Sequence, residues 1–414
     1  MMEERRQWFL PALVFLSVVA IAGLVWANYV FSLRNPGGND FLARWMGARF
    51  WLKQGISPYD LRVSHATQEM IYGHLADPAT GEDIGHFVYP LTSMLFFGPF
   101  GLLDYLTART LWMTLLEVSL IALAVMSLKL AEWRVSIVKA AALLLFAVLW
   151  YHGVRAIIVG QFAALDAVLM TGSLLLIMGG QDTGAGFLLA LSTAKPQMVF
   201  LLVPFVLLWA FSARRRQIIG SFFATLGLLL FVSILLLPQW PLQMLWQVLE
   251  YPEYTNIGSP LSIIASTAPG INAPLNWALH GVSLLYLFFE WIRTWGKDEH
   301  QFLWTALLTI VVTNIVAFRT ATTNYVVLLP VLFLIFKVFE DRWGRIGQIT
   351  TWFWLFVLFF GLWLLFMRTV QGNVENAIMY LPLPVYCLLG LWWVRWWLIN
   401  PPLLQLERLG QELR

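Results

Sequence analysis

The sequence predicts an all-α polytopic membrane protein. Of its 414 residues, 59% are hydrophobic and 12% are charged, whereas soluble domains are about half apolar and a quarter charged. Several apolar runs reach the roughly 20 residues that a membrane-spanning helix needs, and the 22 tryptophans are typical of aromatic belts at two membrane interfaces. A net charge of +3 does not indicate nucleic acid as a partner, and the single Cys387 excludes an internal disulfide framework.

The apolar runs indicate about twelve membrane spans in a single transmembrane domain, residues 1–414. Arg5 and Arg6 precede the first run and place the N-terminus in the cytoplasm of a cell with an inner or plasma membrane. Residues 32–88 are then the first extracytoplasmic loop, 238–273 the second, and 399–414 a cytoplasmic tail. The predicted spans are 8–31, 89–105, 106–128, one that begins at 140–150, 161–178, 196–210, 218–237, 274–295, 302–318, 324–339, 350–366 and 377–398.

The first loop concentrates the charged and aromatic residues that the spans lack. Residues 39–53 suit one amphipathic helix, with Asn39 as its cap and Asp40 in its first turn, where the helix dipole favours a carboxylate. Arg44 follows four residues later on the same face, and Gly55 ends the helix. The apolar positions form one stripe, which predicts a helix lying in the membrane interface: Phe41, Trp45, Ala48, Trp51 and Leu52.

Residues 184–210 form an apolar run that is too long for one span and too short for two. Lys195 and Pro196 interrupt it, so we expect a broken or re-entrant segment that ends at Lys195. An ionisable residue at membrane depth is costly and is a candidate for function, and irregular backbone there usually lines a cavity.

The polar residues predict separate chemical roles in a group transfer at the outer membrane face. Asp40 suits a general base for an alcohol, and cations suit a phosphate. Gln161 has two readings, as part of the site or as a hydrogen-bonding residue between helices. The predicted donor-binding residues are Lys195, Arg49, Arg319, Arg44, Tyr89, Gln161, Asn324, Tyr325 and Tyr59.

Several short motifs follow one another along the chain. The first-loop motif is Asp40-Phe41…Ala48…Gly55…Pro58-Tyr59, and Tyr89-Pro90-Leu91…Pro99…Ala108…Leu111-Trp112 follows it. Gly160-Gln161, Leu189-Ala190…Lys195-Pro196 and Thr323-Asn324-Tyr325…Leu328…Pro330 complete the set. In order and spacing these motifs, over residues 38–335, resemble glycosyltransferase family 87, which includes actinobacterial mannosyltransferases and arabinofuranosyltransferases that use polyprenyl-phosphate sugars.

This resemblance implies a GT-C membrane fold and a metal-independent, inverting transfer without a cofactor. The sugar passes from a polyprenyl-phosphate sugar to a lipid or glycan hydroxyl at the extracytoplasmic face, with Asp40 as the catalytic base. The family often carries a His or Asp where this chain has Asn324, and a Ser-Pro pair before it that this chain lacks. A proton-relay role therefore does not carry over to Asn324, and Arg319 and Lys195 remain for the donor phosphate.

Four other interpretations stay open at this point. A transporter or lipid flippase calls for inverted repeats and a midplane site, and a non-catalytic membrane assembly subunit does not need the Asp40 and Lys195 arrangement. His65, Glu69 and His74 are candidates for a metal site, although that spacing is common by chance. Asp40 itself fits a structural acid at a helix start, paired with Arg44.

Overall fold

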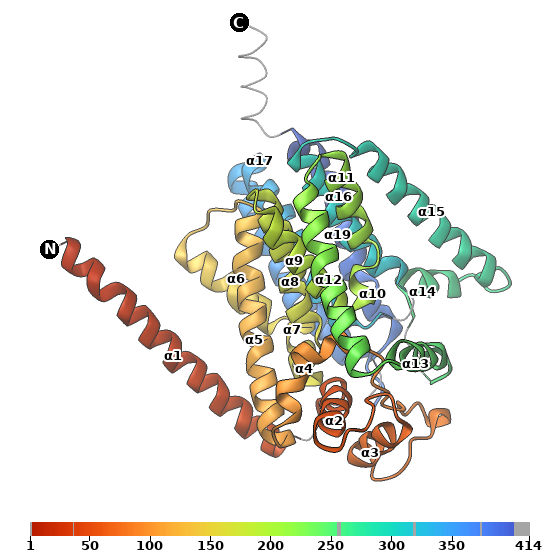
Figure 1. Cartoon of the computed structure of the whole chain (residues 1–414). Coiled ribbons are helices and arrows are strands. Elements are labelled where there is room, and N and C mark those ends of the chain that lie inside the picture. Colours follow the sequence, from red (N-terminus) through yellow and green to blue (C-terminus); the bar gives the residue numbers. More distant parts are fainter. Residues whose placement is uncertain (1, 36, 255–257, 318–319, 373–374, 401–414) are drawn as a thin grey trace, which may run out of the picture. The chain divides into compact units, whose positions relative to one another are not determined.

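The computed structural model describes all residues except 1, 36, 255–257, 318–319, 373–374 and 401–414, and the described part is built of helices and loops (Figure 1). The chain divides into two compact units. Unit 1 comprises Met1–Val118, Ile157–Gln161 and Trp240–Tyr254, and unit 2 comprises Ser119–Ala156, Phe162–Gln239 and Thr255–Arg414. The single continuous transmembrane domain stays a prediction.

Unit 1 contains the first loop and the helices around it. Its elements are α1 (Met2–Arg34), α2 (Asn39–Gln54), α3 (Leu61–Tyr72), η1 (Pro78–Thr80), η2 (Leu91–Ser93), α4 (Met94–Gly101) and α13 (Trp240–Tyr254). Two helices, α5 (Tyr105–Leu130) and α7 (Tyr151–Val159), contribute residues to both units. Within unit 1, α2 packs against α3 and α4.

Unit 2 holds the remaining helices. In it α9 lies along α8 and α12, and α16 packs against α11, α15 and α19 (Figure 1). Its elements are α6 (Ile137–Leu149), α8 (Ala163–Met178), α9 (Asp182–Leu191), η3 (Ser192–Ala194), α10 (Pro196–Val199), α11 (Leu202–Ser212), α12 (Arg216–Leu236), α14 (Pro260–Ser266), α15 (Asn272–Arg293), α16 (Glu299–Val316), η4 (Thr322–Leu328), α17 (Leu329–Phe356), η5 (Val357–Gly361), α18 (Leu362–Thr369), η6 (Ala377–Tyr380) and α19 (Pro382–Ile399).

Long apolar helices identify the chain as a membrane protein. Among the described residues, five segments are long and apolar enough to cross a membrane, or six if α6 and α7, bent by 48°, form one span. The five are Val14–Arg34, Tyr105–Leu130, Arg216–Leu236, Thr322–Thr369 and Ala377–Ile399. Shorter apolar helices occupy other predicted spans, so the total of twelve stays a prediction.

The first-loop helix forms where the sequence predicts it, with two corrections. It runs from Asn39 to Gln54 and ends at Gly55, whose φ of 68° suits glycine. Asn39 as the cap is wrong, because Gly38 precedes the helix and no side chain caps it. The single apolar stripe is also wrong, because Leu42, Ala43 and Met46 are buried as well, while Leu52 is exposed. Helix α2 is therefore enclosed by protein on several sides.

The predicted break at Lys195 is confirmed. Helix α9 ends at Leu191, one 3-10 turn follows, and Lys195 has non-helical angles (φ −125°, ψ 78°) before α10 begins at Pro196. Proline disfavours the helical conformation of the preceding residue, which accounts for the break. The span predicted over 196–210 stays a prediction; the helix there is interrupted, since α10 ends at Val199 and α11 begins at Leu202. The tail predicted at 399–414 lies almost wholly outside the described residues.

Candidate functional site

The Asp40 carboxylate has an amide partner from a distant part of the chain. Gln161 donates a hydrogen bond of 2.9 Å from Nε2 to Oδ2 of Asp40. The Asp40 side chain is half-buried, while Gln161 is only 6% exposed. Tyr89 donates from its hydroxyl to Oε1 of Gln161 over 3.4 Å, and the Arg44 guanidinium lies 4.6 Å from the centroid of the Tyr89 ring. Four predicted site residues therefore lie together in unit 1.

Gly160 explains why Gln161 reaches Asp40. Its φ is +74°, and a Cβ atom there would lie 2.5 Å from Cβ of Phe41, so a larger residue fits neither the backbone nor the space. The indole of Trp112 donates to the Gly160 carbonyl over 2.9 Å and stacks on Phe41 with ring centroids 4.9 Å apart. This close contact fixes the start of α2 against the end of α7, and with it the pairing of Asp40 and Gln161.

Helix α13 holds the rest of the first loop in place. Gln247 donates to the Tyr59 carbonyl over 3.1 Å and accepts from the Val88 backbone N–H over 3.1 Å. Val88 has a φ of 44°, a strained conformation for a β-branched residue. Tyr59 in turn donates to the Tyr89 carbonyl over 2.6 Å. The second loop thus supports the strained backbone that presents Tyr89 to the Asp40 site.

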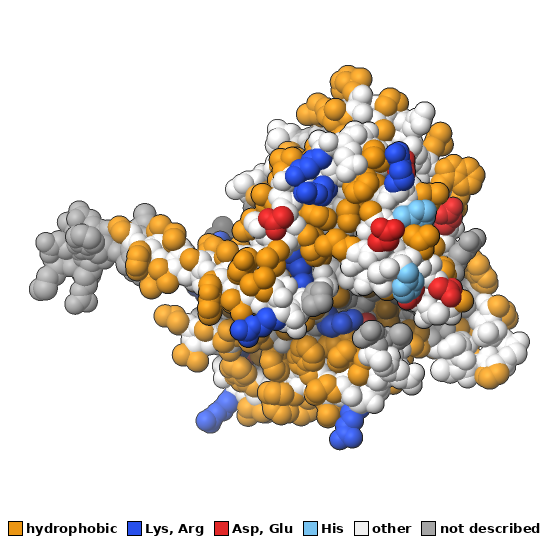
Figure 2. All heavy atoms as spheres, turned by 90° about the horizontal axis from the view of Figure 1, so that it is seen from below, with side chains coloured by type: hydrophobic (Ala, Val, Ile, Leu, Met, Phe, Trp, Pro, Cys, Tyr) orange, Lys and Arg blue, Asp and Glu red, His pale blue; other side chains and the backbone are white. Residues whose placement is uncertain are grey.

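A buried histidine joins the same two loops. His86 is 3% exposed, with Nδ1 2.7 Å from the Ser64 hydroxyl and Nε2 3.3 Å from Oε2 of Glu250 on α13. Burial lowers the pKa of His86, and the nearby Glu250 opposes this effect. Asp83 is in contact with solvent, but the protein atoms around its carboxyl group partly desolvate it. This desolvation raises the pKa of Asp83, and the negative charge of Asp40 raises it further. Figure 2 shows acidic, basic and histidine side chains near one another on one face of the molecule.

The predicted residues of unit 2 form a separate, fully buried cluster. The Lys195 ammonium donates to Oδ1 of Asn324 over 2.7 Å, and Asn324 donates to the Thr320 hydroxyl over 3.2 Å. Lys195 is 1% exposed. Asp166 on α8 is fully buried and acts electrostatically on Lys195, and its oxygens have no hydrogen-bond partner among the described residues. Tyr325 donates to the Tyr380 carbonyl over 3.1 Å.

Two other predicted residues, and the acid just after the first-loop motif, have different surroundings. Arg49 donates to the Leu103 carbonyl over 3.0 Å. Because Arg49 follows Asp40 by nine residues, it lies on the opposite side of α2. Asp60 caps α3 and pairs with Arg62 over 2.8 Å. Arg319 lies outside the described residues.

The candidate metal ligands of the first loop do not converge on a common site among the described residues. Within the part of the chain that the structure describes, no three His, Cys, Asp or Glu side chains are placed to hold a metal ion. His74 instead pairs with Glu82 over 3.3 Å, and both lie at the surface of the loop. The metal-independent transfer remains a proposal on chemical grounds.

Sequence reasoning missed four residues of these clusters: Asp166, Asp83, His86 and Gln247. Asp166 carries the clearest signal, because a carboxylate within an apolar helix is itself a candidate for function. Asp83 and His86 lie in a polar loop and Gln247 lies in helix α13, and nothing in the local sequence separates these three residues from their neighbours.

Residues 87–320 match the family model of glycosyltransferase family 87. The match covers more than half of the chain. It includes Tyr89, Gln161 and Lys195, and it begins after Asp40 and ends before Asn324. No curated protein and no solved structure matches the chain.

Proposed function

The chain belongs to glycosyltransferase family 87, and from this premise we propose that it moves a sugar from a polyprenyl-phosphate sugar to a hydroxyl of a lipid or glycan. As a membrane glycosyltransferase it has a sugar donor and an acceptor as substrates. The observation that carries the proposal is the half-buried Asp40 carboxylate, held through one oxygen by Gln161. The reaction takes place at the extracytoplasmic face of the cell membrane, where the charge pattern places the first loop.

Asp40 acts as the general base. A sugar or lipid hydroxyl is too weakly acidic to attack unaided, so a carboxylate must accept its proton as the new bond forms. A carboxylate accepts several hydrogen bonds, so the Gln161 amide fixes its orientation and still leaves capacity for the acceptor hydroxyl. The alkoxide oxygen attacks the anomeric carbon from the face opposite the phosphate, and the configuration inverts as the C–O bond to the phosphate breaks.

Arg44 stabilises the leaving phosphate. Arg44 shares a helix face with Asp40 and lies over the Tyr89 ring. Lys195 is a second cation proposed to contact the donor, and an amide oxygen of Asn324 accepts from its ammonium group. Cations that neutralise the developing charge make a divalent ion unnecessary.

The test is transfer by the purified protein in lipid nanodiscs, with a panel of radiolabelled polyprenyl-phosphate sugars and a membrane lipid extract as acceptor. We expect one donor to label a lipid or glycan product, with the anomeric configuration inverted and with the rate unchanged by EDTA. Loss of activity in EDTA with rescue by manganese or magnesium contradicts the metal-independent mechanism. Transfer from a nucleotide sugar but from no polyprenyl-phosphate sugar contradicts the proposed donor.

A further inference from the structure

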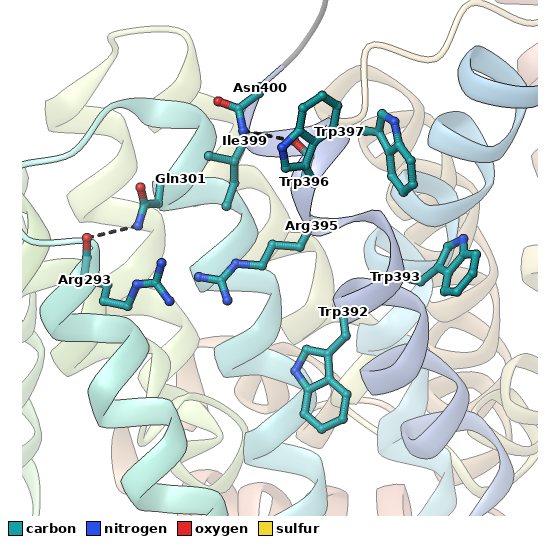
Figure 3. A pocket seen from close by; sticks show the side chains of 9 residues that line it. All are labelled: Arg293, Gln301, Trp392, Trp393, Arg395, Trp396, Trp397, Ile399 and Asn400. Atoms are coloured by element: carbon teal, nitrogen blue, oxygen red, sulfur yellow. Dashed lines mark hydrogen bonds between the residues drawn. The ribbon is translucent and has the colours of Figure 1, made fainter.

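A cavity of about 560 Å³ lies within unit 2, and none of the residues assigned to sugar transfer lines it. It is lined by the last turn of α15, by Gln301 near the start of α16, and by the end of α19. Figure 3 shows the guanidinium groups of Arg293 and Arg395 pointing toward each other from α15 and α19. Four tryptophans from α19 complete the lining: Trp392, Trp393, Trp396 and Trp397.

The charge of this cavity is positive. Glu290 is 1% exposed and accepts from both terminal nitrogens of Arg395, over 2.9 and 2.6 Å. Arg293 lies farther from the same carboxylate, at 3.8 Å, and its side chain is half exposed. One carboxylate against two guanidinium groups leaves one net positive charge. The end-on pairing also leaves Nε–H and the outer N–H groups of Arg395 free of Glu290, so both arginines retain donors for an anion.

The tryptophans indicate the depth of the cavity in the membrane. Trp393 is 63% exposed and Trp396 is 57% exposed, and exposed tryptophans of membrane proteins sit at the level of the lipid headgroups. The predicted span count places this end of α15 and α19 on the cytoplasmic side, with Arg214–Arg216. Anionic lipids are enriched in that leaflet, and basic pockets between helices bind their headgroups.

We propose that this cavity binds the headgroup of an anionic phospholipid from the cytoplasmic leaflet, with its phosphate between Arg293 and Arg395. Arg293 and the free edge of Arg395 donate to the phosphate oxygens, as guanidinium groups do. The Oε1 atom of Gln301 accepts from a headgroup hydroxyl, because its Nε2 already donates to the Arg293 carbonyl over 3.0 Å. The acyl chains leave along the exposed faces of Trp392 and Trp393. This site does not depend on the proposed sugar transfer.

The experiment measures lipid binding to the full chain by native mass spectrometry, in detergent with added phosphatidylglycerol or phosphatidylcholine. We expect phosphatidylglycerol to bind preferentially to the wild type and to raise its melting temperature. Arg293→Gln should weaken phosphatidylglycerol binding about fivefold, since one interfacial arginine contributes on that scale. Because Arg293 is half exposed, the variant should melt like the wild type in phosphatidylcholine, which verifies its folding.

Arg368→Gln is the matched control, because Arg368 also stands in the last turn of a helix and is exposed, but does not line the cavity. It should bind phosphatidylglycerol like the wild type. Equal binding of the two lipids overturns the proposal, and so does an Arg293→Gln variant with undiminished phosphatidylglycerol binding. Displacement of the lipid by millimolar inorganic phosphate also overturns it, since the site then takes a free anion.

Discussion

Asp40 in unit 1 and Lys195 in unit 2 are both charged and both paired with an amide, yet their surroundings differ. Asp40 is half-buried beside Gln161, whereas Lys195 is 1% exposed and donates to Asn324. A group that takes a proton from a substrate must be reachable, and a charge inside an apolar region must have a partner. We therefore propose proton transfer at Asp40, and we expect the Asn324 amide to stabilise the buried Lys195 ammonium.

The largest effect should come from Asp40→Asn. Asparagine keeps the size of the side chain, so folding should be nearly unchanged, but it removes the base. Turnover should fall by roughly 10²–10⁴-fold, while donor binding changes by no more than a few-fold. Asp60→Asn is the control: asparagine still caps α3, and the exposed pair with Arg62 contributes little to stability, so turnover should stay near the wild-type rate.

Gly160→Ala should give the next largest effect. The new methyl group meets Phe41 at 2.5 Å and the backbone φ is +74°, so the contact that orients Gln161 must shift. A displacement of about 1 Å at a reacting group costs up to about 10²-fold in rate, and a loss of that size in steady-state turnover is expected. Gly180→Ala introduces similar strain at φ +71° with no atom within 4 Å. If both variants lose activity equally, backbone strain and not the Phe41 contact is responsible.

In unit 2 the expected effect is on stability. Asn324→Leu removes the acceptor of the buried Lys195 ammonium, which should lower the free energy of unfolding by roughly 1–3 kcal/mol. Thermal denaturation in nanodiscs measures it. Thr193→Val is a suitable control, because the Thr193 hydroxyl only donates to the Ala190 carbonyl within its own helix turn. An unchanged melting temperature of Asn324→Leu shows that the Lys195 pairing contributes nothing to the fold.

The smallest effect is a pH dependence of the contact between the first loop and α13. Burial lowers the pKa of His86, so the fold favours the neutral ring; this stability is present above the ordinary pKa of about 6.5 and is lost as pH falls through the lowered value. The protection factors of residues 57–89 in hydrogen exchange, that is, the intrinsic exchange rate at each pH divided by the observed rate, should therefore fall between pH 7 and pH 5. His86→Asn should abolish the change, whereas His74→Asn, at the exposed Glu82 pair, should retain it.

Local features of the fold could be predicted from the sequence. The end of α2 at Gly55 and the break at Lys195 each follow from one or two neighbouring residues, a glycine and a proline. The partner of Asp40 could not be predicted in the same way, since Gln161 lies 121 residues away and reaches it only through the contact of Gly160 with Phe41.

Which residues of α2 and α8 are buried, and against what, could not be predicted from the sequence either. The amphipathic pattern of residues 39–53 predicts one buried face, but packing against α3 and α4 buries Leu42 and Met46 as well. The Asp166 carboxylate is similar: its sequence position marks it as unusual, but its relation to Lys195 depends on how α8 packs against the turn that ends at Ala194.

The most direct test of Asp40 as the base compares acceptors of different acidity. An acceptor whose attacking group ionises more readily, such as a thiol in place of the hydroxyl, needs little help from a base. We predict that the ratio of wild-type to Asp40→Asn rates, measured in single turnovers with saturating donor, falls at least about tenfold with the thiol acceptor. An equal ratio for thiol and hydroxyl acceptors contradicts the proton-accepting role and leaves Asp40 as a structural residue of α2.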